Sequence, residues 1–333
     1  MRATASDPDG WPRRKQTMTR SSTLGSLMAS FRRSRRGGPA IAVWGGLSVL
    51  ALSVLQACSP LTAANTAFVG SGMTAAADVS YADGARRMLD VYAPEEAQNA
   101  PVVVFFYGGS WRNGQRSQYR FVGDTLARRG IVTVIPDYRL YPDVQFPLFV
   151  EDGAKAVAWV RDHIAAYGGD PDRIVLAGHS AGAHIAALLA LDDGYLQSEN
   201  VDRRAIRGML GMAGPYGFDL LTLASTRPIF ETVGDDRDKA IPTVFVSSAA
   251  PPMVLLHGRD DDTVEPANTQ DLAGALRDSG VPVDVFMYDG VGHVGLLAGL
   301  FPIPGVPSEV TGDVADGIRR LVLNGERIDA DAQ

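Results

Sequence analysis

The sequence predicts an α/β domain in which helices cover both faces of a mostly parallel sheet. From about residue 87 onward, short runs rich in Val, Ile and Leu alternate with longer segments of helical periodicity. The apolar runs show no polar alternation, which is typical of parallel strands buried on both faces. Strands that alternate with helices of about 10–15 residues indicate a parallel sheet. The length of 333 residues suits one large domain with additional segments.

The individual elements follow from the same pattern, and glycines end several of them. The expected strands are 102–107, 131–135, 173–177, 208–212, 252–256 and 282–288. The expected helices are 118–129, 149–167, 181–191, 269–279 and about 310–323. Residues 215–250 interrupt the alternation with Gly, Pro, Ser and Thr. We expect this insertion to form a small lid or, alternatively, a long surface loop.

Charge is distributed unevenly along the chain. Residues 1–57 contain nine Lys or Arg and two Asp, a net charge of +7, whereas the whole chain carries −7. Residues 58–333 therefore carry −14, and their sequence contains no basic stripe. Because an acidic body repels phosphate groups, we do not expect a nucleic acid partner. The basic residues belong to a segment with a different role.

The N-terminal segment has the layout of a secretory signal. The sixteen residues 40–55 carry no charge and follow the basic cluster 32–36. As a helix they would span roughly 24 Å, less than the ~30 Å of a bilayer core, so a spanning anchor is the second choice. The following L-Q-A-C resembles the bacterial lipoprotein box, which implies lipid attachment at Cys58, the only cysteine of the chain. An ordinary signal peptide with an incidental cysteine is the other alternative.

These features give the expected domain organisation and location. Residues 1–57 are a signal peptide with a lipobox, 58–80 a tether of small residues, 81–325 the folded domain and 326–333 a tail. The protein is then a lipid-anchored membrane protein of the bacterial cell envelope, and it faces the periplasm or the exterior. We expect it to contact the membrane through this lipid anchor.

Ser180 is the expected nucleophile. It is the central residue of G-H-S-A-G at 178–182, between the strand 173–177 and the helix 181–191. A G-x-S-x-G motif in this context resembles the nucleophile elbow of α/β-hydrolases. The sharp turn strains the Ser backbone, and the two glycines are needed because larger side chains would collide there. The alternative is a small-residue turn that only lets the helix and the strand pack closely.

His293 is the expected general base. A serine hydroxyl needs a base within hydrogen-bond reach, and imidazole has a suitable pKa. Of five histidines, only His257 and His293 follow Ser180, as the chain order of nucleophile, acid and base requires. His257 precedes the expected acid, which excludes it as the base. Glycines near His293 predict a loop that carries its ring over the strand ends. The other two histidines near the elbow, His179 and His184, are interpreted as structural or pocket-lining.

Asp261 is the expected acid, although spacing alone does not choose it. Three adjacent carboxylates, Asp260, Asp261 and Asp262, follow the strand 252–256. One of them should orient the His293 ring and stabilise its imidazolium form. Several hydrolase families share H-G-x-x-D-x-x-V at this place, and that pattern falls on Asp261. Asp260 and Asp262 remain the alternatives.

The backbone N–H groups of Gly109, Ser110 and Ala181 are the expected oxyanion hole. Attack on a carbonyl creates an alkoxide that needs donors already in place. The residue after the nucleophile supplies one donor, and the loop after an early strand supplies another. The sequence Y-G-G-S-W at 107–111 ends such a strand. The alternative is a tight turn without a function.

Together these motifs resemble α/β-hydrolase esterases of the hormone-sensitive lipase, kynurenine formamidase and BD-FAE-like groups. The similarity covers roughly residues 80–325 and includes D-Y-R-L at 137–140 and G-H-S-A-G-A-H at 178–184. It implies the α/β-hydrolase fold in one domain that needs no metal and no organic cofactor. Formamidases carry H-G-G-x-W, whereas this chain has Tyr107 in place of the histidine, which weakens a formamidase assignment.

The expected function is therefore the hydrolysis of a small-molecule carboxylic ester through an acyl-enzyme. The same triad chemistry cleaves amides, so an amidase, formamidase or peptidase is the alternative within the fold. A catalytically inactive lipoprotein of the envelope is the alternative from another class of protein.

Overall fold

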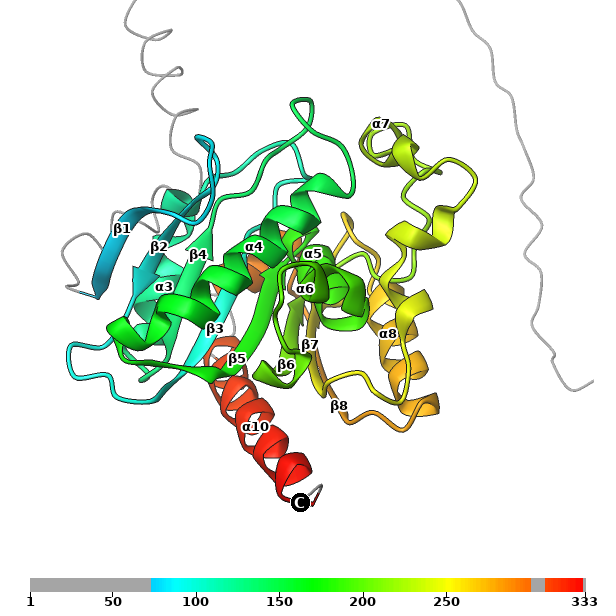
Figure 1. The fold of residues 1–333 in the computed structure, drawn as a ribbon. Coiled ribbons are helices and arrows are strands. Elements are labelled where there is room, and N and C mark those ends of the chain that lie inside the picture. The colour runs from blue at the N-terminus through cyan, green and yellow to red at the C-terminus, as the bar shows by residue number, and fades with distance from the viewer. Residues whose placement is uncertain (1–72, 301–308, 332–333) are drawn as a thin grey trace, which may run out of the picture. The chain divides into compact units, whose positions relative to one another are not determined.

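Eight strands form one sheet in the computed structural model, which describes residues 73–300 and 309–331, with side chains of the last helix as far as Leu323. The described residues belong to the unit Leu55–Gln333, whereas a second unit, Met1–Val54, lies outside them. The strands are β1 (Thr74–Ser80), β2 (Met88–Tyr92), β3 (Ala100–Phe106), β4 (Val132–Pro136), β5 (Gly169–His179), β6 (Ile206–Met212), β7 (Met253–Gly258) and β8 (Val283–Tyr288). Their order in the sheet is β1-β2-β4-β3-β5-β6-β7-β8 (Figure 1).

The sheet is parallel from β4 to β8 and antiparallel at one edge. β3 pairs in parallel with β4 and β5, and β5, β6, β7 and β8 continue the parallel ladder. β2 pairs antiparallel with β4, and β1 pairs antiparallel with β2. The carboxyl ends of all the parallel strands therefore lie on the same side of the sheet. Open α/β sheets carry their sites at these strand ends.

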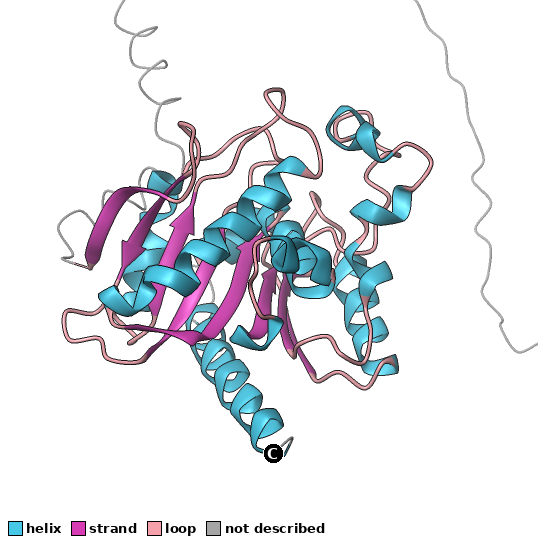
Figure 2. Ribbon diagram, in the orientation of Figure 1, coloured by secondary structure: helices cyan, strands magenta, loops and turns pink. Residues whose placement is uncertain are grey.

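Helices cover both faces of this sheet. The longer helices are α3 (Arg120–Ala127), α4 (Leu148–His163), α5 (Ala181–Leu191), α8 (Ala267–Asp278) and α10 (Glu309–Asp331). The shorter ones are η1 (Arg116–Tyr119), η2 (Ile164–Tyr167), α6 (Asp193–Ser198), η3 (Arg203–Ala205), α7 (Arg227–Phe230), η4 (Glu231–Val233), η5 (Arg237–Ala240), η6 (Pro242–Phe245) and α9 (His293–Ala298). α4 and α6 lie in front of the sheet and α10 lies behind it (Figures 1 and 2).

The central strands form the core between the two helical layers. Val102, Val103 and Val104 are consecutive in β3, so they point alternately to opposite faces, yet none is exposed to solvent. Every residue of α5 is buried as well, which explains why its sequence is Ala- and Leu-rich without a polar stripe. The predicted α/β class with a mostly parallel sheet is confirmed.

The predicted elements correspond to β3–β8 and to α3, α4, α5, α8 and α10, whereas β1 and β2 were not predicted. β1 has the sequence T-A-A-A-D-V-S, is largely exposed and pairs on one side only, so no apolar run marks it. It lies within the expected tether 58–80, and its pairing with β2 moves the start of the folded domain from residue 81 to Thr74. α10 likewise continues to Asp331, into the expected tail 326–333. The signal segment 1–57, Cys58 and the tether as far as residue 72 lie outside the described residues.

The expected lid 215–250 folds into the short helices α7, η4, η5 and η6. Ile229 and Phe230 at the end of α7 are fully buried. The Phe230 ring centroid lies 4.8 Å from that of Trp111 and 5.4 Å from that of Phe146. The Nε2–H of His184 in α5 donates to the Ala240 carbonyl at 2.8 Å. This connecting segment is therefore packed against α5 and against the loops that follow β3 and β4.

Candidate active site

The backbone at Ser180 forms a sharp turn between β5 and α5. β5 ends at His179 and α5 begins at Ala181, so Ser180 alone makes the turn. Its φ is 55° and its ψ is −122°, a left-handed φ that an L-residue rarely adopts and that costs of order 1–3 kcal/mol. The predicted strained elbow is therefore present at the carboxyl end of a central strand.

The two glycines of the elbow are required by close backbone contacts. A Cβ added to Gly182 would lie 2.0 Å from the Phe106 carbonyl oxygen, and one added to Gly178 would lie 2.4 Å from the Gly182 carbonyl carbon. Neither contact involves a flexible side chain that could move away. Any larger residue at these positions would push α5 away from β3 and β5.

Asp261 lies against the ring of His293, at the carboxyl ends of the strands β7 and β8. His293 Nδ1 donates to Asp261 Oδ2 at 2.7 Å, and Asp261 Oδ1 accepts the N–H groups of Thr263 and Val264 at 2.9 Å each. Asp261 is buried, whereas Asp260 and Asp262 are exposed. Of the three adjacent carboxylates, the structure brings Asp261 to the imidazole.

The surroundings of Asp261 keep it ionised. Burial alone would raise its pKa, but hydrogen bonds from His257, from His293 and from the Val264 N–H outweigh that effect and hold the pKa well below its usual range. An ionised carboxylate only accepts hydrogen bonds, so the proton of a neutral His293 ring lies on Nδ1. The Nε2 lone pair of His293 is then free to accept a proton.

His293 is held beside the elbow by His179. The Nε2–H of His179, the residue before Ser180, donates to the His293 carbonyl at 3.1 Å, and the two ring centroids are 4.7 Å apart. Burial, together with the nearby His293, lowers the pKa of His179 to about 3, so this ring stays neutral. His293 is the first residue of helix α9 rather than part of the loop that we expected, and the preceding turn contains Gly290 at φ +73°.

The loop after β3 lies directly against the nucleophile. A Cβ added to Gly108 would lie 3.0 Å from Ser180 Cβ. Gly109 has φ +133° and Ser110 has φ +53°, so the chain turns sharply after β3, next to the elbow. Ala181 is the first residue of α5, so its N–H is one of those without an intrahelical partner. The three expected oxyanion donors thus belong to two backbone segments in contact around Ser180.

Tyr107 stands where formamidases carry a histidine, and it anchors this loop. Its hydroxyl donates to Asp137 Oδ1 at 2.8 Å and accepts from the Arg86 guanidinium at 2.8 Å. The hydroxyl of Tyr138 in turn donates to the Tyr107 carbonyl at 2.8 Å, and the two rings stack with centroids 4.8 Å apart. The D-Y-R-L segment therefore fixes the start of the loop that follows β3.

Two further histidines are fully buried. Burial lowers the pKa of His184 to about 4, which the hydrogen bond to the Ala240 carbonyl partly opposes. His257 contacts the acid of the site: its Nε2 lies 3.2 Å from Asp261 Oδ2. The sequence excluded His257 as the base from chain order, which the geometry supports, but it missed this contact. The four-residue separation of His257 and Asp261 in the H-G-x-x-D pattern was the available signal.

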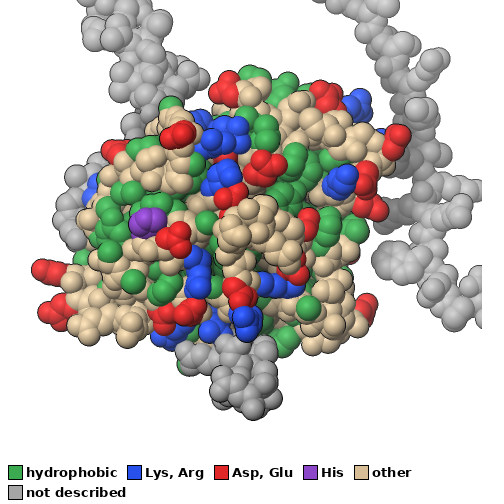
Figure 3. Space-filling view, viewed as in Figure 1, with side chains coloured by type: hydrophobic (Ala, Val, Ile, Leu, Met, Phe, Trp, Pro, Cys, Tyr) green, Lys and Arg blue, Asp and Glu red, His purple; other side chains and the backbone are tan. Residues whose placement is uncertain are grey.

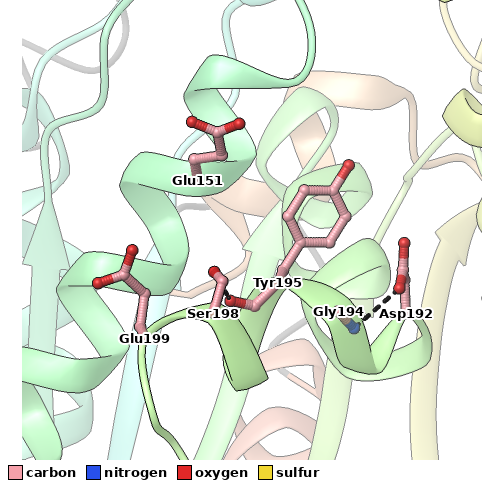
Figure 4. Close-up of a pocket in the computed structure, with 6 residues that line it drawn as sticks. All are labelled: Glu151, Asp192, Gly194, Tyr195, Ser198 and Glu199. Atoms are coloured by element: carbon pink, nitrogen blue, oxygen red, sulfur yellow. Dashed lines mark hydrogen bonds between the residues drawn. The ribbon is translucent and has the colours of Figure 1, made fainter.

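One hollow of the described surface lies away from Ser180, Asp261 and His293. An open hollow of about 400 Å³ is lined by Glu151, Asp192, Gly194, Tyr195, Ser198 and Glu199 (Figure 4). It contains none of the triad residues, and Glu199 is paired with Lys155. The face that carries α4 and α6 intersperses acidic and basic side chains (Figure 3). Within 73–300 and 309–331, no group of three His, Cys, Asp or Glu side chains is arranged to hold a metal ion.

The sheet order, the elbow at Ser180 and the imidazole–carboxylate pair beside it define an α/β-hydrolase fold. The chain belongs to the BD-FAE family, whose model matches residues 89–276.

Curated relatives carry esterase names. The chain is 34% identical over 243 residues to a probable isoprenylcysteine alpha-carbonyl methylesterase, ICMEL1, of Oryza sativa subsp. japonica, with 66% of this chain and 57% of the relative covered. It is 35% identical over 222 residues to the esterase LipQ of Mycobacterium tuberculosis, with 61% and 53% covered. The chain thus spans little more than half the length of these relatives.

Solved structures show the same fold. Esterase B from Lactobacillus rhamnosis matches with a TM-score of 0.67 at 20% identity, over 86% of this chain and 98% of that chain. A truncated carbohydrate esterase from gut microbiota matches with a TM-score of 0.64 at 18% identity, over 74% and 96%. At these identities the matches establish the fold alone.

Proposed function

We propose that the protein is a serine hydrolase of small-molecule carboxylic esters. The observation that carries the proposal is the 2.7 Å hydrogen bond between His293 Nδ1 and a buried, ionised Asp261, next to the strained elbow of Ser180. Nucleophile, base and acid follow each other in the chain order of the fold. The names of the curated relatives, which are methylesterases and esterases, support an ester as substrate.

The proposed reaction is acyl transfer in two halves. His293 Nε2 takes the proton of the Ser180 hydroxyl while the oxygen attacks the ester carbonyl, and Asp261 stabilises the imidazolium that forms. The imidazolium then gives its proton to the leaving alcohol, and an acyl-enzyme remains. Water, deprotonated by His293, attacks the acyl group, and the proton returns to Ser180 as the carboxylic acid leaves.

The N–H groups of Gly109, Ser110 and Ala181 are proposed to receive the negative charge of both tetrahedral intermediates. They come from the start of a helix and from a loop with three successive residues of positive φ, Gly109, Ser110 and Trp111, which can point several N–H groups at one position. Removing one such donor typically costs about 10²–10³ in kcat. Tyr107, in the place of the formamidase histidine, favours an ester over a formyl amide as the substrate.

Ser180→Ala tests the proposal. We expect this variant to lose turnover of p-nitrophenyl acetate by on the order of 10⁴-fold or more, because the nucleophile is removed. Ser198→Ala is the matched control, since Ser198 lies in the hollow of Figure 4 and its hydroxyl donates only to the Tyr195 carbonyl. A fluorophosphonate probe should label the wild type and the Ser198 variant, but not the Ser180 variant. Labelling that persists without Ser180 would refute the assignment.

Lipid attachment at Cys58 is proposed as the means by which the protein is held at a membrane of the bacterial envelope. It rests on the uncharged segment 40–55, the lipobox resemblance and the single cysteine. Within the part of the chain that the structure describes, no helix is long and apolar enough to cross a membrane.

A further inference from the structure

A second histidine reaches the same carboxylate oxygen as His293. His257, near the end of β7, has no exposed surface. Its Nε2 lies 3.2 Å from Asp261 Oδ2 and 2.9 Å from the Val264 carbonyl oxygen. Its Nδ1 lies 2.7 Å from the hydroxyl of Thr269, which belongs to α8. Both ring nitrogens are therefore within hydrogen-bond distance of a partner.

These partners show that Nε2 of His257 carries a hydrogen. A carbonyl oxygen and an ionised carboxylate can only accept, so Nε2 of His257 carries the hydrogen. It donates to the Val264 carbonyl at 2.9 Å, with Asp261 Oδ2 at 3.2 Å as a second, weaker acceptor. The Thr269 hydroxyl forms the hydrogen bond at Nδ1, at 2.7 Å. His257 thus presents its Nε2–H to Asp261, while Nδ1 is held by the Thr269 hydroxyl.

The contact completes the set of donors around Asp261. Oδ1 accepts two backbone N–H groups, from Thr263 and Val264, and Oδ2 accepts His293 and His257. A rotation of the carboxylate would break bonds at both oxygens, so Oδ2 stays directed at His293. Without the His257 donor, Oδ2 keeps only His293 as a partner, the ring that must change its charge during the reaction.

We infer that His257 is a positioning residue for the hydrolysis, acting through Asp261 on His293. This inference rests on the proposed function and adds a member to the site. His257 touches neither the nucleophile nor the ester, so it acts only by fixing the carboxylate that orients the base. Thr269 is hydrogen-bonded to Nδ1 of His257 and so connects the site to helix α8.

Two variants separate the two nitrogens of the ring. In His257→Gln, the amide nitrogen lies as many bonds from Cβ as Nε2 and can still donate to Asp261. In His257→Asn, the amide oxygen takes the place of Nδ1 and can still accept from Thr269, but the donor to Asp261 is lost. Each variant keeps one contact, so a merely structural role predicts that both lose a similar amount of stability and have similar activity when folded.

The measurement is kcat and KM for p-nitrophenyl acetate, with thermal unfolding of each variant. We expect His257→Asn to lower kcat about tenfold or more with little change in KM, and His257→Gln to recover most of it. Equal kcat for the two folded variants would overturn the inference while leaving the Ser180-dependent activity of the wild type intact. A wild type without such activity would instead remove the proposed function, and the inference with it.

Thr269 provides a second pair that keeps the histidine. If the His257 variants do not fold, Thr269→Val removes the hydroxyl that holds the ring, and Thr269→Ser retains it. We expect the Val variant to lose several-fold in kcat at unchanged KM and the Ser variant to resemble the wild type. Val and Ser variants with the same kcat would overturn the inference.

Discussion

At the scale of single residues, the acid of the site differs from its two neighbours in the donors that surround it. Asp261 accepts two backbone N–H groups at Oδ1 and His293 at Oδ2, where His257 Nε2 also lies at 3.2 Å, whereas Asp260 and Asp262 are exposed to solvent. Burial without those donors would raise the pKa of the carboxylate and cost it the charge that the imidazolium needs. All three positions are aspartates, but only Asp261 has the surroundings that the proposed acid needs.

Asp261→Asn is expected to lower kcat by about 10⁴-fold. The two backbone N–H groups at Oδ1 require an oxygen, so the amide would turn its NH₂ group toward His293. His293 Nδ1 must then accept, its proton moves to Nε2, and the base toward Ser180 is lost. Steady-state kinetics at pH 7 measure this loss.

Asp262→Asn is the control for that substitution, because Asp262 is exposed and adjacent in sequence. It should keep kcat within about twofold of the wild type, as surface substitutions generally do. If Asp262→Asn were the inactive variant and Asp261→Asn the active one, the acid would have been assigned to the wrong residue.

At the scale of elements, the strand–turn–helix unit β5–α5 is held by backbone contacts that leave no room for a Cβ. The distance of 2.0 Å between a Cβ on Gly182 and the Phe106 carbonyl oxygen is far below any real contact. This closeness brings α5 against β3, and it places Ala181 next to the loop of Gly109. The glycines of the motif therefore serve the packing of the unit as much as the strain at Ser180.

Gly182→Ala is expected to destabilise the protein by more than about 3 kcal/mol, since the backbone of β3 or α5 must shift. Gly274→Ala in α8 is the matched control, because a Cβ there meets nothing within 4 Å. It should instead raise the free energy of unfolding by roughly 0.5–1 kcal/mol, since Ala favours a helix more than Gly. Urea unfolding followed by circular dichroism measures both. Similar stabilities for the two variants would contradict the packing argument.

At the scale of the whole molecule, the described chain enters the sheet at the edge opposite to the site. Thr74 at the start of β1 pairs with Tyr92 at the end of β2, and Tyr92 pairs with Thr133 near the start of β4. Ser180 follows the end of β5, which runs parallel to β4 through β3. The start of β1 and the elbow at Ser180 therefore lie at opposite ends of the strands.

Cys58→Ser tests the proposed attachment. We expect the wild type, produced in a bacterium from the full chain, to partition into the detergent phase of a Triton X-114 separation. The variant should move to the aqueous phase with its esterase activity retained, because Cys58 precedes the folded domain. If the variant remains in the detergent phase, the protein is held by another segment, such as a spanning helix over 40–55.

The sequence alone determined the fold class, and it predicted the nucleophile and the base of the proposed triad. Val-rich runs of strand length that alternate with helical segments indicate buried strands of a parallel sheet. G-H-S-A-G between a strand and a helix is a local pattern whose geometry follows from nearby residues. The base followed from chain order, because His293 is the only histidine after the acidic cluster. These properties depend on neighbours in sequence, so a linear pattern contains them.

Only the tertiary structure decided the rest. Which of three adjacent aspartates meets His293, 32 residues away, depends on how β7 and β8 end beside each other. The contacts of His257 with Asp261 and of Tyr107 with Asp137 are set by side chains that several strands bring together. β1 has no apolar signature of its own, because it gains its hydrogen bonds from β2 and buries little. Packing between distant segments fixes these features, and the order of residues does not encode them locally.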